Sequence, residues 1–308
     1  MPTFAKGKIF KYTSVIVLVV VALPAYLFLY EPKYKGLIST DEQILVFAHR
    51  GFGNHAPDNS LEGARIAVAQ GFDGVDVDAQ FSQDEEVVIF HDVSLERFTT
   101  GEGRIDAKTL TELQTYDLGT KYGNGFSGVY IKTFEDFVKE ITPDAYLMVE
   151  LKVPAASDTG IERRVNEVLA KHNAYERVYI SSFNPVVLHR LKKMDPRIKT
   201  VFIFMDTGWD PKRIAETKEE DRVTLPWYLQ TEWTRTLIRK LVKPDAVSIQ
   251  YQVDEAVIDK LLAKGYPVFL WSVNDETSVD FALRKNSYGL VTDEPPLAKK
   301  MRDKYEHR

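Results

Sequence analysis

Seven ionisable residues in the first half of the chain combine the side chains needed to cleave a phosphodiester. They are two histidines, three acids and two bases: His49, His91, Asp76, Asp78, Glu150, Arg50 and Lys152. Carboxylate oxygens suit a hard divalent cation such as Mg²⁺ or Ca²⁺. Imidazoles can move protons onto and off reacting oxygens near neutral pH, and Arg and Lys counter the charge of phosphate oxygens. We therefore expect phosphodiester chemistry with one divalent cation.

The positions of these residues along the chain favour one shared site. Apolar runs at residues 44–48, 87–90 and 145–149 each end where part of the set begins. The two aspartates alternate on the strand predicted at residues 74–78, so their side chains point the same way. Each residue alone has a simpler interpretation, as a structural histidine or a surface ion pair. Polar chemistry at the carboxyl ends of successive strands is nevertheless how a parallel α/β barrel builds its site.

Strand and helix signals alternate through the rest of the chain. We expect eight strands, centred on Ile44, Val75, Tyr146, Val178, Val201, Val247, Val268 and Val291. An additional strand or a loop extension is expected at Val87–Phe90. The pattern predicts the α/β class and, within it, a (β/α)8 TIM barrel over residues 43–308 with a transmembrane helix before it.

Two segments interrupt this alternation. Residues 101–130 are rich in Gly and polar residues and are expected to form a small excursion over the barrel mouth. Residues 206–236 form an insertion that contains the aromatic residues Trp209, Trp227, Tyr228 and Trp233. These aromatic side chains either pack the insertion onto the barrel or provide an apolar wall for an acyl chain or a bilayer.

The first thirty residues form a separate element. Residues 1–11 carry three lysines and no acid, and residues 12–30 are 19 residues without a charge. As a helix, this stretch would be about 28 Å long, close to the apolar thickness of a bilayer. We expect a transmembrane anchor at 12–30 and a polar linker at 31–42 that holds the barrel close to lipid. The basic flank predicts a cytoplasmic N-terminus and a catalytic domain on the non-cytoplasmic side.

A cleaved signal peptide is the alternative for this element, although residues 22–25 lack a clear cleavage site.

The amino-acid composition excludes some kinds of chemistry and of binding partner. The chain has no cysteine, which excludes disulfides and thiolate chemistry. Its net charge is −5, and residues 31–308 alone carry −8 because the first thirty residues hold three lysines and no acid. This balance argues against a nucleic-acid partner. The sequence predicts no particular oligomeric state.

The motifs in this order resemble the glycerophosphodiester phosphodiesterase family. The similarity covers residues 44–300 and rests on Ala56–Ser60, Gly74–Asp78, Val88–Asp92, Leu95–Gly101, Val149–Lys152, Ser181–Pro185, Trp271–Asn274 and Gly289–Pro295, after His49-Arg50-Gly51. The resemblance implies a TIM barrel and metal-dependent hydrolysis of a glycerophosphodiester to an alcohol and glycerol 3-phosphate. The implied substrates include lysophospholipids, which would be hydrolysed in a reaction of the lysophospholipase D type.

The resemblance implies that His49 and His91 are the acid–base pair, and side-chain chemistry indicates the roles of the other residues. Catalysis is assigned to His49 and His91, cation binding to Asp76, Asp78 and Glu150, and phosphate binding to Arg50 and Lys152. Substrate binding or support of the other groups is assigned to Asp58, Asn59 and Trp271. Asp58 and Asp76 stand where the family usually has Glu, so each side chain is shorter by one methylene, about 1.5 Å.

Two other interpretations stay open at the level of the sequence. Another barrel phosphodiesterase, of the phosphoinositide phospholipase C or sphingomyelinase D type, would also use two histidines and a metal. The two shortened acids suggest a membrane-anchored binding protein with an inactive site. The motifs at residues 57–60 and 271–274 favour the glycerophosphodiesterase, and the retained histidines and bases favour activity.

Overall fold

The computed structural model describes residues 33–34, 36–38, 43–153, 157–206 and 229–306. The basic flank at 1–11 and the anchor expected at 12–30 lie outside these residues, as does most of the insertion expected at 206–236. Within the described ranges, no helix is long and apolar enough to cross a membrane.

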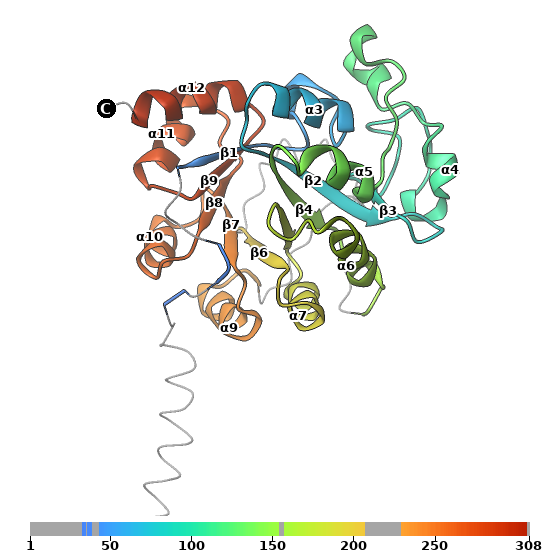
Figure 1. The fold of residues 1–308 in the computed structure, drawn as a ribbon. Coiled ribbons are helices and arrows are strands. Elements are labelled where there is room, and N and C mark those ends of the chain that lie inside the picture. Colours follow the sequence, from blue (N-terminus) through green and yellow to red (C-terminus); the bar gives the residue numbers. More distant parts are fainter. Residues whose placement is uncertain (1–32, 35, 39–42, 154–156, 207–228, 307–308) are drawn as a thin grey trace, which may run out of the picture.

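Eight parallel strands form a closed barrel at the centre of the molecule (Figure 1). In sheet order they are β1 (Leu45–Ala48), β9 (Gly289–Thr292), β8 (Val268–Trp271), β7 (Ala246–Gln250), β6 (Lys199–Phe204), β5 (Val178–Ser182), β4 (Tyr146–Leu151) and β2 (Gly74–Phe81). Strand β1 pairs with β2 as well as with β9, which closes the sheet. The predicted TIM barrel is confirmed, and only the strand expected at Ile44 begins one residue later.

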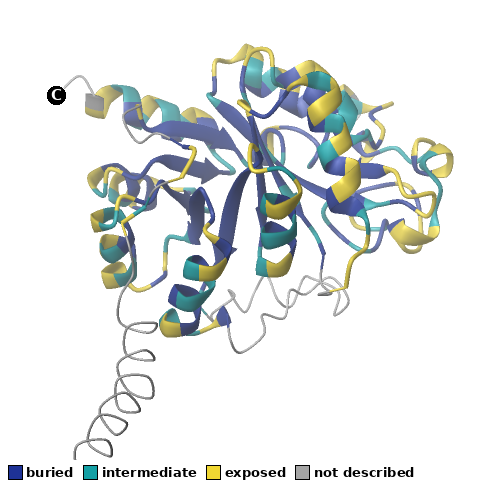
Figure 2. Cartoon of the chain, turned by 60° about the horizontal axis from the view of Figure 1, so that its bottom comes forward, coloured by how far each residue is buried: buried dark blue, intermediate teal, exposed yellow. Residues whose placement is uncertain are grey.

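Helices surround the barrel and follow its strands in turn. They are α3 (Leu61–Ala69), α5 (Phe134–Ile141), α6 (Ile161–His172), α7 (Pro185–Met194), α9 (Glu232–Val242), α10 (Glu255–Ala263), α11 (Glu276–Arg284) and α12 (Pro295–Glu306). Figure 2 shows the strands as a buried layer and the helices with exposed outer faces. The main core therefore lies between the outer face of the sheet and the inner faces of the helices.

One strand and several short helices lie outside the barrel proper. Strand β3 (Val87–Ile89) runs antiparallel to β2. After it come η3 (Ile105–Ala107), α4 (Leu110–Leu113), η4 (Gly119–Tyr122) and η5 (Asn124–Phe126). A separate hydrophobic cluster holds this excursion together, with Val88, Phe90, Leu95, Phe98, Ile105, Leu113, Leu118, Val129 and Ile131 as its buried members. The excursion expected at 101–130 is thus part of a larger unit that begins at β3.

Aromatic side chains fill the amino-terminal half of the barrel interior. They come from five positions around the sheet, Phe47, Tyr146, Tyr179, Phe269 and Tyr288. The rings of Phe47 and Phe269 meet edge to face at 5.4 Å between centroids. Beside them, Gly74 and Gly289 leave room for these rings, because an added Cβ would lie 2.4 Å from the Phe47 ring or 2.5 Å from the Phe269 ring.

Replacement of Gly74 by Ala tests this packing. We expect Gly74→Ala to lower the free energy of unfolding by about 1–3 kcal/mol, because the new methyl group must displace a ring that neighbouring rings hold in place. Gly125→Ala is the matched control, since nothing lies within 4 Å of its added Cβ. Urea unfolding followed by circular dichroism measures both variants. A Gly74→Ala protein as stable as the parent would contradict the close contact.

Candidate active site

A cavity of about 360 Å³ at the carboxyl end of the barrel collects the predicted site residues. Its lining includes His49, Arg50, Asp58, Asp76, Asp78, His91, Glu150, Lys152 and Trp271. Asn59, the remaining predicted residue, is buried directly behind Asp78. The strands end at this face of the barrel, so residues more than 200 positions apart in the sequence meet there.

The buried carboxylate of Asp78 is the centre of the polar network. Lys152 Nζ lies 3.0 Å from its Oδ1, and Asn59 Nδ2 donates to its Oδ2 at 2.9 Å. Asn59 Oδ1 also accepts from the backbone N–H of Asp78 at 2.8 Å. Burial opposes ionisation, but the charges of Lys152 and Arg50 and the hydrogen bond from Asn59 outweigh it and hold the pKa of Asp78 well below its usual range. Asp78 is therefore a paired carboxylate at neutral pH.

Asp76 lies on the same face of β2 but in the opposite electrostatic state. Among the described residues, none makes a hydrogen bond or an ion pair with its carboxylate. Burial raises the pKa of Asp76 to about 7, and the nearby Asp78 and Glu150 add to this effect against the opposing charges of His49 and Lys152. A partly buried acid without an ion-pair partner is costly in the charged form, so this position favours either a proton or a cation.

The three acids match the chemistry of a hard cation, but in this structure Lys152 lies between two of them. Its Nζ is 2.8 Å from Glu150 Oε1 as well as 3.0 Å from Asp78 Oδ1. In the part of the chain that the structure describes, no three acidic or histidine side chains are grouped as metal ligands. The donor set fits Mg²⁺ or Ca²⁺ through the unpaired Asp76 carboxylate, and a bound cation would have to displace the Lys152 ammonium from between Asp78 and Glu150.

A chain of hydrogen bonds from the last strand holds His49. His49 Nδ1 lies 2.6 Å from Asp293 Oδ1, and Asn274 Nδ2 donates to Asp293 Oδ2 at 2.6 Å. Burial lowers the pKa of His49, but the charge and hydrogen bond of Asp293 outweigh it, so the pKa is raised above its ordinary value. Since Nδ1 faces Asp293, Nε2 is the nitrogen left for the substrate, and the imidazole favours its protonated form.

A hairpin outside the barrel presents the second histidine. His91 follows β3, and its Nδ1 lies 2.5 Å from Asp92 Oδ1. Gln80 Nε2 lies 2.8–3.0 Å from the backbone carbonyl oxygens of residues 90–92 and fixes this turn. Burial lowers the pKa of His91 well below its ordinary value, and the positive charges of Arg50 and Lys152 lower it further. The two imidazoles thus favour opposite protonation states.

Two donors in the cavity wall are buried without a hydrogen-bond partner in the described part of the chain. Arg50 donates from Nη1 to Asp58 Oδ2 at 3.0 Å, but its Nε has no acceptor within hydrogen-bond distance. Tyr122 in the excursion donates to the other oxygen of Asp58 at 2.8 Å and so helps to hold the guanidinium. Trp271 Nε1 is also without a partner. Buried donors of this kind suit the oxygens of a bound substrate.

Residues 49–297 of this chain match the model of the glycerophosphoryl diester phosphodiesterase family. The chain belongs to that family. A glycerophosphodiester phosphodiesterase of Caldanaerobacter subterraneus subsp. tengcongensis is 27% identical, with 82% of this chain and 94% of the relative covered. Glycerophosphodiester phosphodiesterase 1 of Bos taurus is 26% identical over 82% of this chain and 80% of its own length.

Solved structures of glycerophosphodiester phosphodiesterases and related enzymes have the same fold. A phosphodiesterase of Oleispira antarctica, solved with the product sn-glycerol-3-phosphate, superimposes with a TM-score of 0.70 at 25% identity and covers 85% of this chain and 97% of its own. A Thermotoga maritima glycerophosphodiester phosphodiesterase gives 0.64 at 24% identity, with 84% and 99% covered. The chain is therefore a phosphoric diester hydrolase of the glycerophosphodiester class, and the other families of barrel phosphodiesterase are no longer alternatives.

Within the glycerophosphodiester phosphodiesterase framework, the structure gives a role to four groups to which sequence analysis had assigned none, although two of them lie in the motifs at residues 271–274 and 289–295. They are Asp293 and Asn274 behind His49, Gln80 behind His91, and Tyr122 beside Asp58. Asp293 follows the last predicted strand, and Gln80 continues the alternation of Asp76 and Asp78, so both had a signal in the sequence. Tyr122 had none, because its position depends on how the excursion folds.

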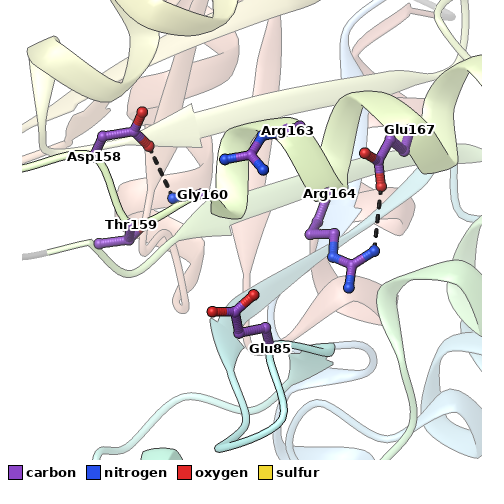
Figure 3. A pocket seen from close by; sticks show the side chains of 7 residues that line it. All are labelled: Glu85, Asp158, Thr159, Gly160, Arg163, Arg164 and Glu167. Atoms are coloured by element: carbon purple, nitrogen blue, oxygen red, sulfur yellow. Dashed lines mark hydrogen bonds and ion pairs between the residues drawn. The ribbon is translucent and has the colours of Figure 1, made fainter.

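A second hollow, of about 550 Å³, lies between the start of α6 and the turn before β3 (Figure 3). Its lining residues are Glu85, Asp158, Thr159, Gly160, Arg163, Arg164 and Glu167. The charged side chains among them are exposed, and the hollow contains neither a histidine nor a buried acid. It shares no residue with the 360 Å³ cavity. We therefore assign the glycerophosphodiester chemistry to the 360 Å³ cavity, which contains both histidines and the buried Asp78.

Removal of the Asp293 charge tests the support of His49. We expect Asp293→Asn to lower the pKa of His49, because burial would then act with less opposition. The limb of the pH–rate profile that follows His49 should move to lower pH, and kcat should fall about 10- to 100-fold, as for other groups that orient a functional side chain. Glu294→Gln, which alters the next residue without touching His49, is the control. An unchanged profile in Asp293→Asn would show that His49 does not depend on this contact.

Proposed function

We propose that the chain hydrolyses glycerophosphodiesters with the help of one divalent cation and releases an alcohol and glycerol 3-phosphate. The observation that carries the proposal is Arg50, which lines the same cavity as Lys152 and both imidazoles and whose buried Nε has no hydrogen-bond acceptor in the described residues, the Asp78 carboxylate being 3.9 Å away. A phosphate group fits such a position because its nonbridging oxygens accept hydrogen bonds from Arg and Lys. The two imidazoles can then act on the bonds that form and break at phosphorus.

The opposite protonation states of the two histidines favour His91 as the general base and His49 as the general acid. His91 is the neutral imidazole and takes the proton from the nucleophile, which is water or a neighbouring glycerol hydroxyl; in the second case water must then open the cyclic phosphate to give glycerol 3-phosphate. His49 is the protonated imidazole and gives its proton from Nε2 to the oxygen of the leaving alcohol. Asp293 keeps the His49 ring in place and stabilises its charge. Arg50 and Lys152 hold the phosphate while negative charge grows on its oxygens.

The cation would be held by Asp76, Asp78 and Glu150, and either Mg²⁺ or Ca²⁺ suits these oxygens. When bound, it supplies positive charge to the phosphate oxygens. The cation would be the ion-pair partner of the Asp76 carboxylate, because none of the described residues forms an ion pair with it. Lys152, displaced from the acids, would be free to hold the phosphate.

Lysophospholipids are a second candidate substrate, favoured by the apolar side of the cavity. Phe183 and Trp271 meet edge to face there at 6.2 Å between ring centroids, with Ile203 beside them in the lining. Such a wall suits the glycerol backbone or the first carbons of an acyl chain. The described end of the insertion contributes Trp233, which is 50% exposed on α9 and is not part of this wall.

For the cellular location, we propose a single-pass membrane protein. The uncharged stretch at residues 12–30 would be the anchor, with residues 1–11 in the cytoplasm and the barrel on the non-cytoplasmic side. N-terminal mass analysis of the membrane-bound protein separates this proposal from cleavage of a signal peptide. A soluble mature chain that begins near residue 26 would refute the anchor.

The two histidines are expected to act in the chemical step. His49→Ala and His91→Ala should each lower kcat for glycerophosphocholine about 10²- to 10⁴-fold, the contribution of a positioned acid or base, with smaller effects on KM. His172→Ala is the matched control, because His172 pairs with Glu135 on the outside of the barrel. Release of glycerol 3-phosphate, measured by a coupled assay, gives the rates. A histidine variant within threefold of the parent would remove that histidine from the mechanism.

Asp76 gives a test of the cation that does not depend on activity. Its raised pKa means that ionisation of Asp76 weakens the metal-free fold as pH rises from about 4 towards 7. Asp76→Asn removes this charge, so it should stabilise the metal-free protein at about pH 8 by about 1–3 kcal/mol and have little effect at about pH 4.

Added Mg²⁺ or Ca²⁺ should raise the unfolding temperature of the parent at about pH 8 but not that of Asp76→Asn. Calorimetry with and without a chelator measures both effects. Full hydrolytic activity of the metal-stripped parent in excess chelator would refute the cation.

A further inference from the structure

Part of the linker predicted at 31–42 is docked against the barrel. Ile38 is only 4% exposed and packs in the barrel interior with the aromatic residues described above. The N–H of Leu37 donates to Asp245 Oδ1 at 3.1 Å. Asp245 is itself buried, and it also pairs with Lys192 at 2.7 Å. This part of the linker therefore makes fixed contacts with the barrel.

Tyr34 adds a second set of contacts a few residues earlier. Its N–H donates to the backbone oxygen of Lys264 at 2.8 Å, and its ring lies 5.2 Å from that of Tyr266, between centroids. The Tyr34 hydroxyl also accepts from the N–H of Ile38 at 3.2 Å, which ties the two sets together. The described residues 33–34 and 36–38 thus form one docked segment.

The docked segment lies at the end of the barrel opposite the active site. Its partners Asp245, Lys264 and Tyr266 come before strands β7 and β8, whereas both histidines, Glu150 and Lys152 lie towards or beyond the carboxyl ends of their strands. A strand rises about 3.3 Å per residue, so strands of four to six residues separate the two ends by roughly 13–20 Å. The chain leaves the catalytic domain on the face away from the cavity.

We propose that this docked segment turns the cavity away from the membrane that holds the anchor, so that the enzyme takes water-soluble glycerophosphodiesters from the aqueous side. The inference rests on the proposed anchor and on the proposed hydrolysis. A lysophospholipid in the same bilayer would have to leave the lipid and travel past the barrel to reach Arg50 and the histidines. The short linker keeps the barrel near lipid, but the end of the barrel that faces the lipid is the one opposite the active site.

The absence of cysteine from the chain allows a direct measurement of this orientation. Glu176→Cys places a unique thiol before β5, at the docked end, and Glu276→Cys places one at the start of α11, beside the cavity. Both side chains are exposed. Each full-length variant is labelled with a donor dye and reconstituted into phosphatidylcholine vesicles that contain a lipid with an acceptor dye on its headgroup.

We expect energy transfer from position 176 to be at least twofold more efficient than from position 276. Equal transfer, stronger transfer from position 276, or failure of the chain to associate with vesicles would overturn the inference. Glycerophosphocholine hydrolysis is measured in the same samples. Loss of hydrolysis would refute the proposed function, whatever the transfer shows.

Substrate preference provides the second measurement. The ratio of lysophosphatidylcholine to glycerophosphocholine turnover should be at least tenfold lower when the lysolipid shares the vesicle with the enzyme than when the full-length enzyme is in detergent. An inserted stretch of twenty Gly and Ser residues between positions 32 and 33, with a span of roughly 25 Å, should restore the ratio, because the barrel can then turn over. An unchanged ratio in shared vesicles would refute the orientation as the cause of selectivity.

Discussion

The active site depends on the need to pair one buried charge, that of Asp78. A buried carboxylate that loses its partner costs about 3–5 kcal/mol, so the chain folds only where compensating groups reach it. Those groups are Lys152, directly after β4, and Asn59, in the turn before α3. The N–H of Asn59 in turn donates to the backbone oxygen of Arg50 at 2.7 Å. Satisfying Asp78 therefore also places the arginine that faces the cavity.

The neighbouring Asp76 shows why the same strand can serve both stability and chemistry. The two acids are two residues apart on one face of β2, yet one is strongly paired and the other has no hydrogen-bonded or ionic partner among the described residues. Asp78 stabilises the fold through its partners, whereas the Asp76 carboxylate stays available to bind a cation. A similar contrast separates the histidines, because Asp293 favours the charge on His49 while Arg50 and Lys152 oppose it on His91.

The barrel and the members of its site could be predicted from the sequence, because parallel strands bring their carboxyl ends to one face. Glu150 and His49 are examples, since each lies at or near such an end, and Asp76 lies one residue beyond Val75, which pairs with the last residue of β1. His91 lies at the barrel mouth, but it does not follow a parallel barrel strand. Strand β3, which precedes it, runs antiparallel to β2 and returns to the mouth as a hairpin. The placement of Lys152 between two acids and the docking of Ile38 were not predictable, because both depend on contacts between distant segments.

The excursion after β3 has a hydrophobic cluster of its own, and this has a consequence for how the family can diversify. Its packing depends mainly on its own apolar residues, and it meets the active site through a few side chains such as Tyr122. Changes in its length or sequence therefore leave the barrel core intact. In evolution or in protein engineering, the part of the unit beyond the His91 turn can be exchanged as a module that reshapes the entrance, while His91 stays in the turn after β3 and the other catalytic groups stay on the barrel.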